Sequence, residues 1–284
     1  MTRSPATARA TARKKTGRIR VGIGGWIFAP WRGTFYPDGL AQRLELDYAS
    51  RHLTSLEINS TYYGAQRPTS FARWRDETPD DFVFALKGPR FAMNRRVLAE
   101  AGASIERFLT GGLLELGDKL GPINWQLMPT KRFEPDDYAR FLELLPAQVE
   151  GRPLRHALEV RHESFCTPEF VALARSRNAA IVMSGDSDYP QIADASAPFV
   201  YARIMGTQAK HRHGYANADL DRWADRAIAW AQGETPDDLD TYATPLKAKT
   251  GRDVFLYVIS GHKARNPAAA MALIERLRER GANA

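Results

Sequence analysis

Charged and amide side chains interrupt most of the apolar runs of this chain, near the end of the run. In the stretch Leu56 to Asn59, Leu56 and Ile58 share one face of a predicted strand, and Glu57 and Asn59 share the other. Counting Glu57, the charged residues at comparable positions in the runs are Glu57, Lys87, Glu159, Arg161, Asp186 and Arg203. Carboxylates can transfer protons, and Arg and Lys bind phosphate or carboxylate groups. These residues therefore predict acid-base chemistry on a small anionic molecule.

Two groups of site residues follow from this pattern. The predicted catalytic residues are Glu57, Glu159, His162 and Asp186. The predicted substrate-binding residues are Trp26, Asn59, Tyr62, Lys87, Gln126, Arg161, Tyr201 and Arg203. For Glu57 and Glu159 the alternative is a structural ion-pair network, and for His162 it is a rim histidine bonded to a carbonyl group. We expect Asp186 to orient a base or a ligand hydroxyl.

The elements that must position these side chains are eight apolar runs separated by segments with helical spacing. The predicted strands are residues 21–25, 55–59, 82–87, 123–128, 157–161, 179–186, 199–205 and 254–259. The predicted helices include residues 40–52, 136–148, 219–232 and a last helix ending near 280, with further helices within 97–120. Thr167 and Asn266 each precede a proline and are expected to cap helices. The alternation predicts an α/β fold, a single TIM-type (β/α)8 barrel, with the polar positions converging at its C-terminal mouth.

Composition divides the chain into a basic tail and a neutral body. Residues 1–20 hold seven Lys or Arg and no acid, which accounts for the whole net charge of +7. We expect residues 1–19 to be a disordered basic tail and residues 20–284 to form one barrel domain. The tail could make weak nucleic-acid contacts, and it lacks the apolar segment of a secretion signal.

The remaining composition favours a cytoplasmic protein that is not embedded in a membrane. The single Cys166 excludes an intramolecular disulfide, and no apolar run approaches the ~20 residues that span a bilayer. We expect no metal site, because His211 and His213 lie in a loop with Lys210 and Arg212 that would repel a cation. The cluster Gly22 to Gly25 lacks the third glycine and the acidic partner of a dinucleotide fingerprint, and no cofactor is predicted.

Several motifs in order resemble the domain of unknown function 72 family, the YecE-like proteins. They are Gly24-Gly25-Trp26, Trp31 to Pro37, Glu57 to Tyr63, Trp125-Gln126-Leu127, Glu159-Val160-Arg161-His162 and Tyr201-Ala202-Arg203. The resemblance covers nearly all of residues 21–277 and implies a TIM-type barrel. It implies no particular reaction.

This chain departs from the family pattern at two strand ends. Met205-Gly206 stands where the family usually has His-Gly, and Ser260-Gly261-His262 stands where it usually has paired asparagines. An activity that needs those groups is altered or absent here, unless His262 replaces them.

Three functions are consistent with these observations. The first is a cofactor-independent enzyme, a hydrolase or isomerase, that uses acid-base chemistry on a phosphorylated or acidic sugar-like substrate. The second is a nucleic-acid-associated protein, a nuclease-like barrel or a binder, that uses the basic tail and the aromatic residues of the mouth. The third is a noncatalytic protein that binds a metabolite, since barrels host many functions.

Overall fold

Eight parallel strands close into a barrel in the computed structural model, which describes residues 16–246 and 250–284. Each strand pairs with its neighbours in chain order, and β10 pairs with β1 to complete the ring. The strands are β1 (Ile19–Gly24), β2 (Ser55–Ile58), β3 (Val83–Lys87), β4 (Leu120–Gln126), β7 (His156–Glu159), β8 (Ala180–Gly185), β9 (Phe199–Ile204) and β10 (Asp253–Val258). The predicted TIM-type barrel is therefore confirmed.

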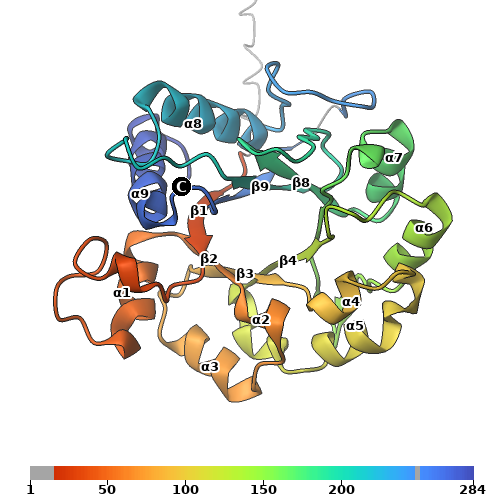
Figure 1. Ribbon diagram of the computed structural model, residues 1–284, viewed down its shortest axis with the longest axis horizontal. Helices are drawn as coiled ribbons and strands as arrows, with labels where there is room; N and C mark the ends of the chain where they lie inside the picture. Colours follow the sequence, from red (N-terminus) through yellow and green to blue (C-terminus); the bar gives the residue numbers. More distant parts are fainter. Residues whose placement is uncertain (1–15, 247–249) are drawn as a thin grey trace, which may run out of the picture.

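Helices surround the barrel on its outer side (Figure 1). They are α1 (Glu45–His52), α2 (Ser60–Tyr63), α3 (Pro68–Asp76), α4 (Arg90–Met93), α5 (Gly102–Leu109), α6 (Pro135–Glu143), α7 (Pro168–Ser176), α8 (Asn217–Ala231) and α9 (Asn266–Glu279). A short hairpin, β5 (Gln148–Val149) with β6 (Arg152–Pro153), precedes β7. Residues 186–198 connect β8 to β9 without a helix.

Strand alternation divides the core into two layers. Outward residues such as Leu56, Phe84 and Leu158 belong to a large apolar cluster shared with the helices. A smaller cluster fills the barrel interior and includes Val83, Ala157, Tyr201, Phe255 and Tyr257. Side chains next to each other along a strand thus lie in different surroundings, as expected for a closed barrel.

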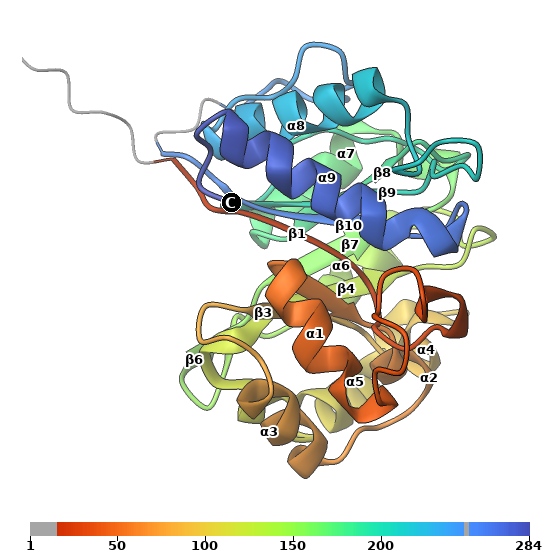
Figure 2. The same cartoon turned by 90° about the vertical axis from the view of Figure 1, so that its left-hand side faces the viewer.

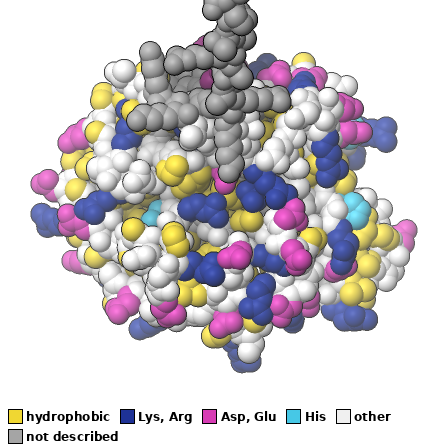
Figure 3. Space-filling view, turned by 180° about the vertical axis from the view of Figure 1, so that it is seen from behind, with side chains coloured by type: hydrophobic (Ala, Val, Ile, Leu, Met, Phe, Trp, Pro, Cys, Tyr) yellow, Lys and Arg dark blue, Asp and Glu magenta, His cyan; other side chains and the backbone are white. Residues whose placement is uncertain are grey.

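At the end of the barrel opposite the mouth, two arginines pack over an aromatic ring. All strands run from the N-terminal end toward the mouth, as β1 shows from left to right in Figure 2. At the N-terminal end the guanidinium groups of Arg20 and Arg155 lie over the Phe255 ring, 5.5 and 5.1 Å from its centroid. Figure 3 shows that Lys and Arg are interspersed with Asp and Glu on this end.

Two predicted features of the chain differ from the structure. Thr167 caps α7 as expected, because its hydroxyl accepts a hydrogen bond from the Phe170 amide. Asn266 makes no capping bond, so that prediction is wrong. Its amide instead bridges two loops of the mouth: its Oδ1 accepts from the Thr207 hydroxyl and its Nδ2 donates to the Ser260 carbonyl group.

Most of the predicted tail, residues 1–15, lies outside the described residues. Of the rest, Gly17 and Ile19 donate backbone hydrogen bonds to the carbonyl groups of Ala231 and Asn283. Within the described chain, no helix combines the length and the apolar character that crossing a membrane requires.

Candidate functional site

A buried cluster of charges fills the mouth end of the barrel interior. Arg203 of β9 is its centre: Nη1 donates to both carboxylate oxygens of Glu159, at 2.8 and 2.6 Å, and Nη2 donates to Glu57 at 3.0 Å. Strand β9 adjoins neither β7 nor β2, so these bonds cross the interior. The guanidinium group therefore occupies the space between the two carboxylates.

Glu159 is the most heavily bonded carboxylate of the cluster. Besides Arg203, it accepts hydrogen bonds from the Asn124 and Gln126 amides, at 2.8 and 2.7 Å, and from Arg161 at 2.9 and 2.7 Å. Burial alone would raise its pKa, but the charges of Arg203 and Arg161 outweigh burial and lower the pKa to about 2. Glu159 therefore stays ionised and orients the cations and amides around it.

Glu57 is anchored by a second buried group. The Tyr201 hydroxyl donates to Glu57 at 2.6 Å, and burial followed by the Glu57 charge holds the pKa of Tyr201 well above its usual value. Below this pair, Tyr201 packs on Tyr257, whose hydroxyl lies 2.7 Å from the Ser55 hydroxyl. Glu57 and Glu159 are both fully buried.

These contacts favour the ion-pair alternative for Glu57 and Glu159 over the predicted roles as acid and base across a substrate. Arg203 fills the gap between them, and neither carboxylate reaches solvent. The ion-pair alternative describes both residues better. Burial alone would lower the pKa of Arg203, but Glu159 and Glu57 keep that pKa above its ordinary value.

The exposed side of the cluster consists of Lys87, Gln126 and Arg161. The Lys87 ammonium donates to Gln126 Oε1 at 2.8 Å and lies 4.3 Å from the centroid of the Tyr62 ring. Arg161 lies over the Tyr189 ring, at 4.4 Å from its centroid. Lys87 and Gln126 retain 8% and 7% of their exposure, and Arg161 is half-buried, so a molecule at the mouth meets these three residues first.

Lys87 differs from the arginines because it has no carboxylate within ion-pair distance in the described part of the chain. Burial lowers its pKa first, and the neighbouring charge of Arg203 adds to that effect. Glu57 and Glu159 act in the opposite direction, and the resulting pKa is about 8. An amine with this pKa exchanges protons near neutral pH.

Three predicted site residues lie elsewhere, each just beyond the end of a strand. Trp26, predicted to bind substrate, packs against Trp74 and Phe84 in the outer layer and not in the barrel interior. His162 Nδ1 accepts from the Ser164 amide at the start of a short 3-10 helix. Asp186 accepts from the Trp223 indole of α8 at 2.7 Å. Within the described residues, none of these three side chains forms a hydrogen bond or an ion pair with the charged cluster.

Asn59 and Tyr62 do lie at the mouth. A side chain at Gly24 would place its Cβ 2.8 Å from Asn59 Nδ2, so glycine is what permits this close approach. Tyr189 was not predicted, because it lies in the irregular connection from β8 to β9, where no periodicity indicates orientation. Its only local signal is the aromatic residue in Asp188-Tyr189-Pro190.

The residues that differ from the family pattern contribute little to the cluster. Met205 belongs to the apolar interior, and His262 is exposed. Ser260 and Gly261 both have positive φ, 55° and 53°, in the turn after β10. Across residues 16–246 and 250–284, no three His, Cys, Asp or Glu side chains are grouped closely enough to hold a metal ion.

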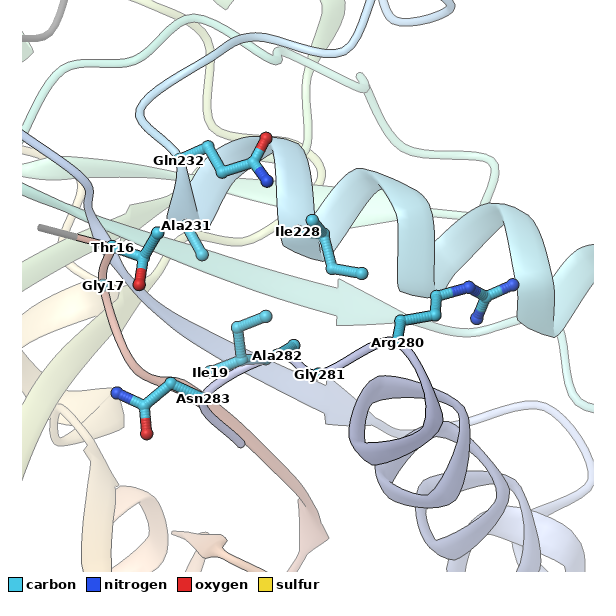
Figure 4. Close-up of a pocket in the computed structure, with 10 residues that line it drawn as sticks. All are labelled: Thr16, Gly17, Ile19, Ile228, Ala231, Gln232, Arg280, Gly281, Ala282 and Asn283. Atoms are coloured by element: carbon cyan, nitrogen blue, oxygen red, sulfur yellow. The ribbon is translucent and has the colours of Figure 1, made fainter. Parts of the chain in front are cut away.

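Pockets lie beside the cluster and at the far end of the barrel. One of about 440 Å³ adjoins Tyr62 at the mouth. Another, of about 720 Å³, lies between α8 and α9 at the N-terminal end (Figure 4). Of the described residues that line the latter, Arg280 alone is charged, and it is paired with Asp221 at 2.9 Å. That pocket offers no free charge for a ligand.

Fold and site together define a TIM-type barrel with a buried ion-pair cluster at its C-terminal mouth. Residues 20–284 match the family described as "Protein of unknown function DUF72", and the chain belongs to this family. The UPF0759 protein YecE of Escherichia coli (strain K12) is 31% identical over 123 residues, 42% of each chain. The UPF0759 protein YunF of Bacillus subtilis is 25% identical over 188 residues, 64% of each. The match thus spans less than two thirds of either curated relative.

Solved structures agree with the fold. A DUF72 family protein from Thermotoga maritima has a TM-score of 0.68 at 19% identity, over 92% of this chain and 99% of that one. A DUF72 family protein from Enterococcus faecalis has a TM-score of 0.65 at 16% identity, over 92% and 98%. At such identities the likeness concerns the fold alone.

Proposed function

We propose that this protein is an enzyme, a hydrolase or isomerase, that performs acid-base chemistry on a small anionic substrate at the barrel mouth, with Lys87 as the group that transfers the proton. This proposal keeps the reaction class predicted from the sequence. It moves the proton transfer from the two glutamates to the lysine beside them, because both glutamates are enclosed and bonded to Arg203.

The single observation that carries the proposal is the state of Lys87. Its amine is nearly enclosed, ends the strand β3 at the mouth, and is held by one amide oxygen and one aromatic ring. With a pKa of about 8, a fraction of the amine is neutral near pH 7 and can accept a proton. Structural lysines on protein surfaces do not have this combination of properties.

Charge supports an anionic substrate. While Lys87 is protonated, the cluster formally holds three cations, Lys87, Arg161 and Arg203, against the two carboxylates of Glu57 and Glu159. An anion at the mouth would balance the remaining positive charge. Arg161 suits this contact because a guanidinium group can bind a phosphate or carboxylate through two parallel hydrogen bonds.

The loops around the mouth extend this positive character. Thirteen Lys or Arg and seven Asp or Glu lie in the connections that follow the barrel strands, residues 25–44, 59–67, 88–101, 127–134, 160–167, 186–198, 205–216 and 259–265. Residues 21–284 as a whole are neutral, so the rest of the body is negative. This arrangement would draw an anion to the mouth rather than to the opposite end.

The test is a ligand screen followed by kinetics. Sugar phosphates and acidic sugars are screened by thermal shift on the wild type, on Lys87→Met, and on the exposed-lysine control Lys210→Met. For a turned-over hit, we expect kcat/KM to rise with pH through about 8 in the wild type and the control, since a base must be deprotonated to act. We expect Lys87→Met to lose at least about a hundredfold in kcat, the usual size of general acid-base catalysis.

Two outcomes would contradict the proposal. Turnover by Lys87→Met with an unchanged pH profile would remove the lysine from the mechanism. A ligand that binds tightly and is recovered unchanged would favour the noncatalytic metabolite-binding function instead.

A further inference from the structure

A pocket of about 440 Å³ adjoins the mouth on the side of β2 and β3. It lies between α2, α4 and α5, which are neighbours in Figures 1 and 2. The charged cluster does not line it. Its volume falls within the range of about 300–1,000 Å³ that holds small molecules.

Aromatic rings form much of the wall of this pocket. Tyr62, Phe91 and Phe108 line it. Phe91 is 65% exposed, with the Arg90 guanidinium 5.2 Å from its ring centroid. Phe108 is held by packing on Trp125, with 5.9 Å between the ring centroids. Exposed and fixed rings on one wall suit a ligand that is itself a planar ring, because aromatic pairs gain energy beyond the area they bury.

The charges of the pocket are all positive. Arg95 and Arg107 line it, and no Asp or Glu does. Neither arginine has an ion pair within the described residues, and Arg95 Nε is buried without a hydrogen-bond acceptor. Ser104 lies one helical turn before Arg107 on α5 and faces the same pocket. The pocket thus offers donors and positive charge with no carboxylate to satisfy them.

The pocket and the mouth share a wall. Tyr62 lines the pocket, and the Lys87 ammonium lies over the same ring at 4.3 Å. The adjacent Thr61 also lines the pocket, and its hydroxyl donates to the Lys87 carbonyl group at 2.7 Å. A molecule seated in the pocket therefore lies next to the strand end that carries the amine.

We propose that this pocket binds a planar aromatic ring that bears a phosphate or carboxylate group, with Phe91 and Tyr62 contacting the ring and Arg95 and Arg107 contacting the anion. A second step rests on the proposed function: the substrate that binds at the mouth carries such an aromatic anionic group. The binding site itself stands on the pocket and its charges alone.

The experiment measures binding of matched small probes by calorimetry. Phenyl phosphate and benzoate carry ring and anion, and they distinguish phosphate from carboxylate. Cyclohexyl phosphate keeps the charge but not the planar ring, and phenol keeps the ring but not the charge. We expect one of the first two to bind at least tenfold more tightly than both cyclohexyl phosphate and phenol.

Variants locate the binding. Arg107→Met and Phe91→Ala alter exposed residues, so folding should be preserved, and each should weaken the tighter probe at least tenfold. Arg67→Met, an exposed mouth arginine that does not line the pocket, is the matched control and should leave binding unchanged. Equal binding by the ring-free probe, no binding by either aromatic anion, or unaltered binding by both pocket variants would overturn the inference.

The design separates this inference from the proposed function. Lys87→Met should still bind the probe in the pocket, because Lys87 does not line it. Loss of turnover in Lys87→Met with intact probe binding supports both. Failure of probe binding in a protein whose catalysis depends on Lys87 would remove the pocket and leave the proposed enzyme.

Discussion

The two ends of the barrel both hold arginines, but they hold them in different ways. At the N-terminal end Arg20 and Arg155 each lie 3.9 Å from Asp253, a residue with a side chain 41% exposed. At the mouth Arg203 makes bonds of 2.6 to 3.0 Å to two carboxylates with no exposure. The first arrangement rests on packing over Phe255 and weak ion pairs, while the second depends on complete pairing.

This difference identifies the end of the barrel where chemistry is feasible. Burying charge is costly unless every partner is in place. The mouth meets that condition for Glu57, Glu159 and Arg203. Beside them, burial and then the charge of Arg203 lower the pKa of Lys87 to about 8, although Glu57 and Glu159 act in the opposite direction. Among the described residues, the cations that lie over Phe255 at the N-terminal end are the guanidinium groups of Arg20 and Arg155, not an amine.

The largest effect should come from breaking the pairing at the mouth. Glu159→Gln removes the charge that faces Arg203 and Arg161, so we expect a loss of about 3–5 kcal/mol in the free energy of unfolding. Chemical denaturation measures it. The control Glu163→Gln changes an exposed acid nearby and should stay within about 0.5 kcal/mol. If Glu159→Gln lowered the free energy of unfolding by less than about 1 kcal/mol, complete ion pairing would not be what stabilises the mouth.

A smaller effect should appear in the pH dependence of stability. The pKa of Lys87 is about 8 in the folded protein against 10.5 in its reference state. Below pH 8 the amine is charged in both states, and the cost of burying it is fully present. Between pH 8 and 10.5 the folded amine is neutral while the unfolded one still binds a proton, so stability rises with pH. Relative to Lys87→Met, the wild type should gain about 2–3 kcal/mol between pH 7 and pH 10.

This pH effect is measured as the difference between denaturation curves of the two proteins at each pH. Other titrating groups occur in both proteins and cancel in the difference. A difference that stays constant from pH 7 to pH 10 would show that Lys87 has an ordinary pKa. The mouth would then hold no amine suited to proton transfer, and the two ends would not differ in this respect.

The smallest effect should come from the N-terminal end. Asp253→Asn removes the charge near Arg20 and Arg155 but keeps an oxygen for the Arg18 amide, which now donates to it at 2.9 Å. Because the carboxylate is 41% exposed and its ion pairs are long, we expect a loss below about 1 kcal/mol that shrinks further in salt. If this substitution cost as much as Glu159→Gln, the two ends would be equivalent.

Strand periodicity predicted the fold and the inward side chains well. The eight strands were located to within a few residues, and alternation correctly placed Glu57, Lys87, Glu159 and Arg203 inside. Alternation succeeds there because each residue lies within a paired strand or at its last position. It cannot say which charges pair, so the place of Arg203 between the glutamates was not foreseen.

The prediction failed where the chain leaves the strands. Gly25 and Asp186 have φ of 71° and 53°, so the alternation is broken immediately before Trp26 and at Asp186 itself. Their side chains turn to the outer layer and to α8. His162 was assigned a role from residue type alone, and a local hydrogen bond with Ser164 satisfies its ring nitrogen instead. Such loop geometry depends on contacts that no periodic pattern encodes.

The backbone amide of Ile19, at the start of β1, donates to the carbonyl group of Asn283, so the C-terminus lies at the end of the barrel opposite the mouth. A biotin or affinity tag attached after Ala284 would consequently orient every immobilised molecule with its mouth toward the solution. Surface-based ligand screening can therefore use the C-terminal anchor without shielding Lys87.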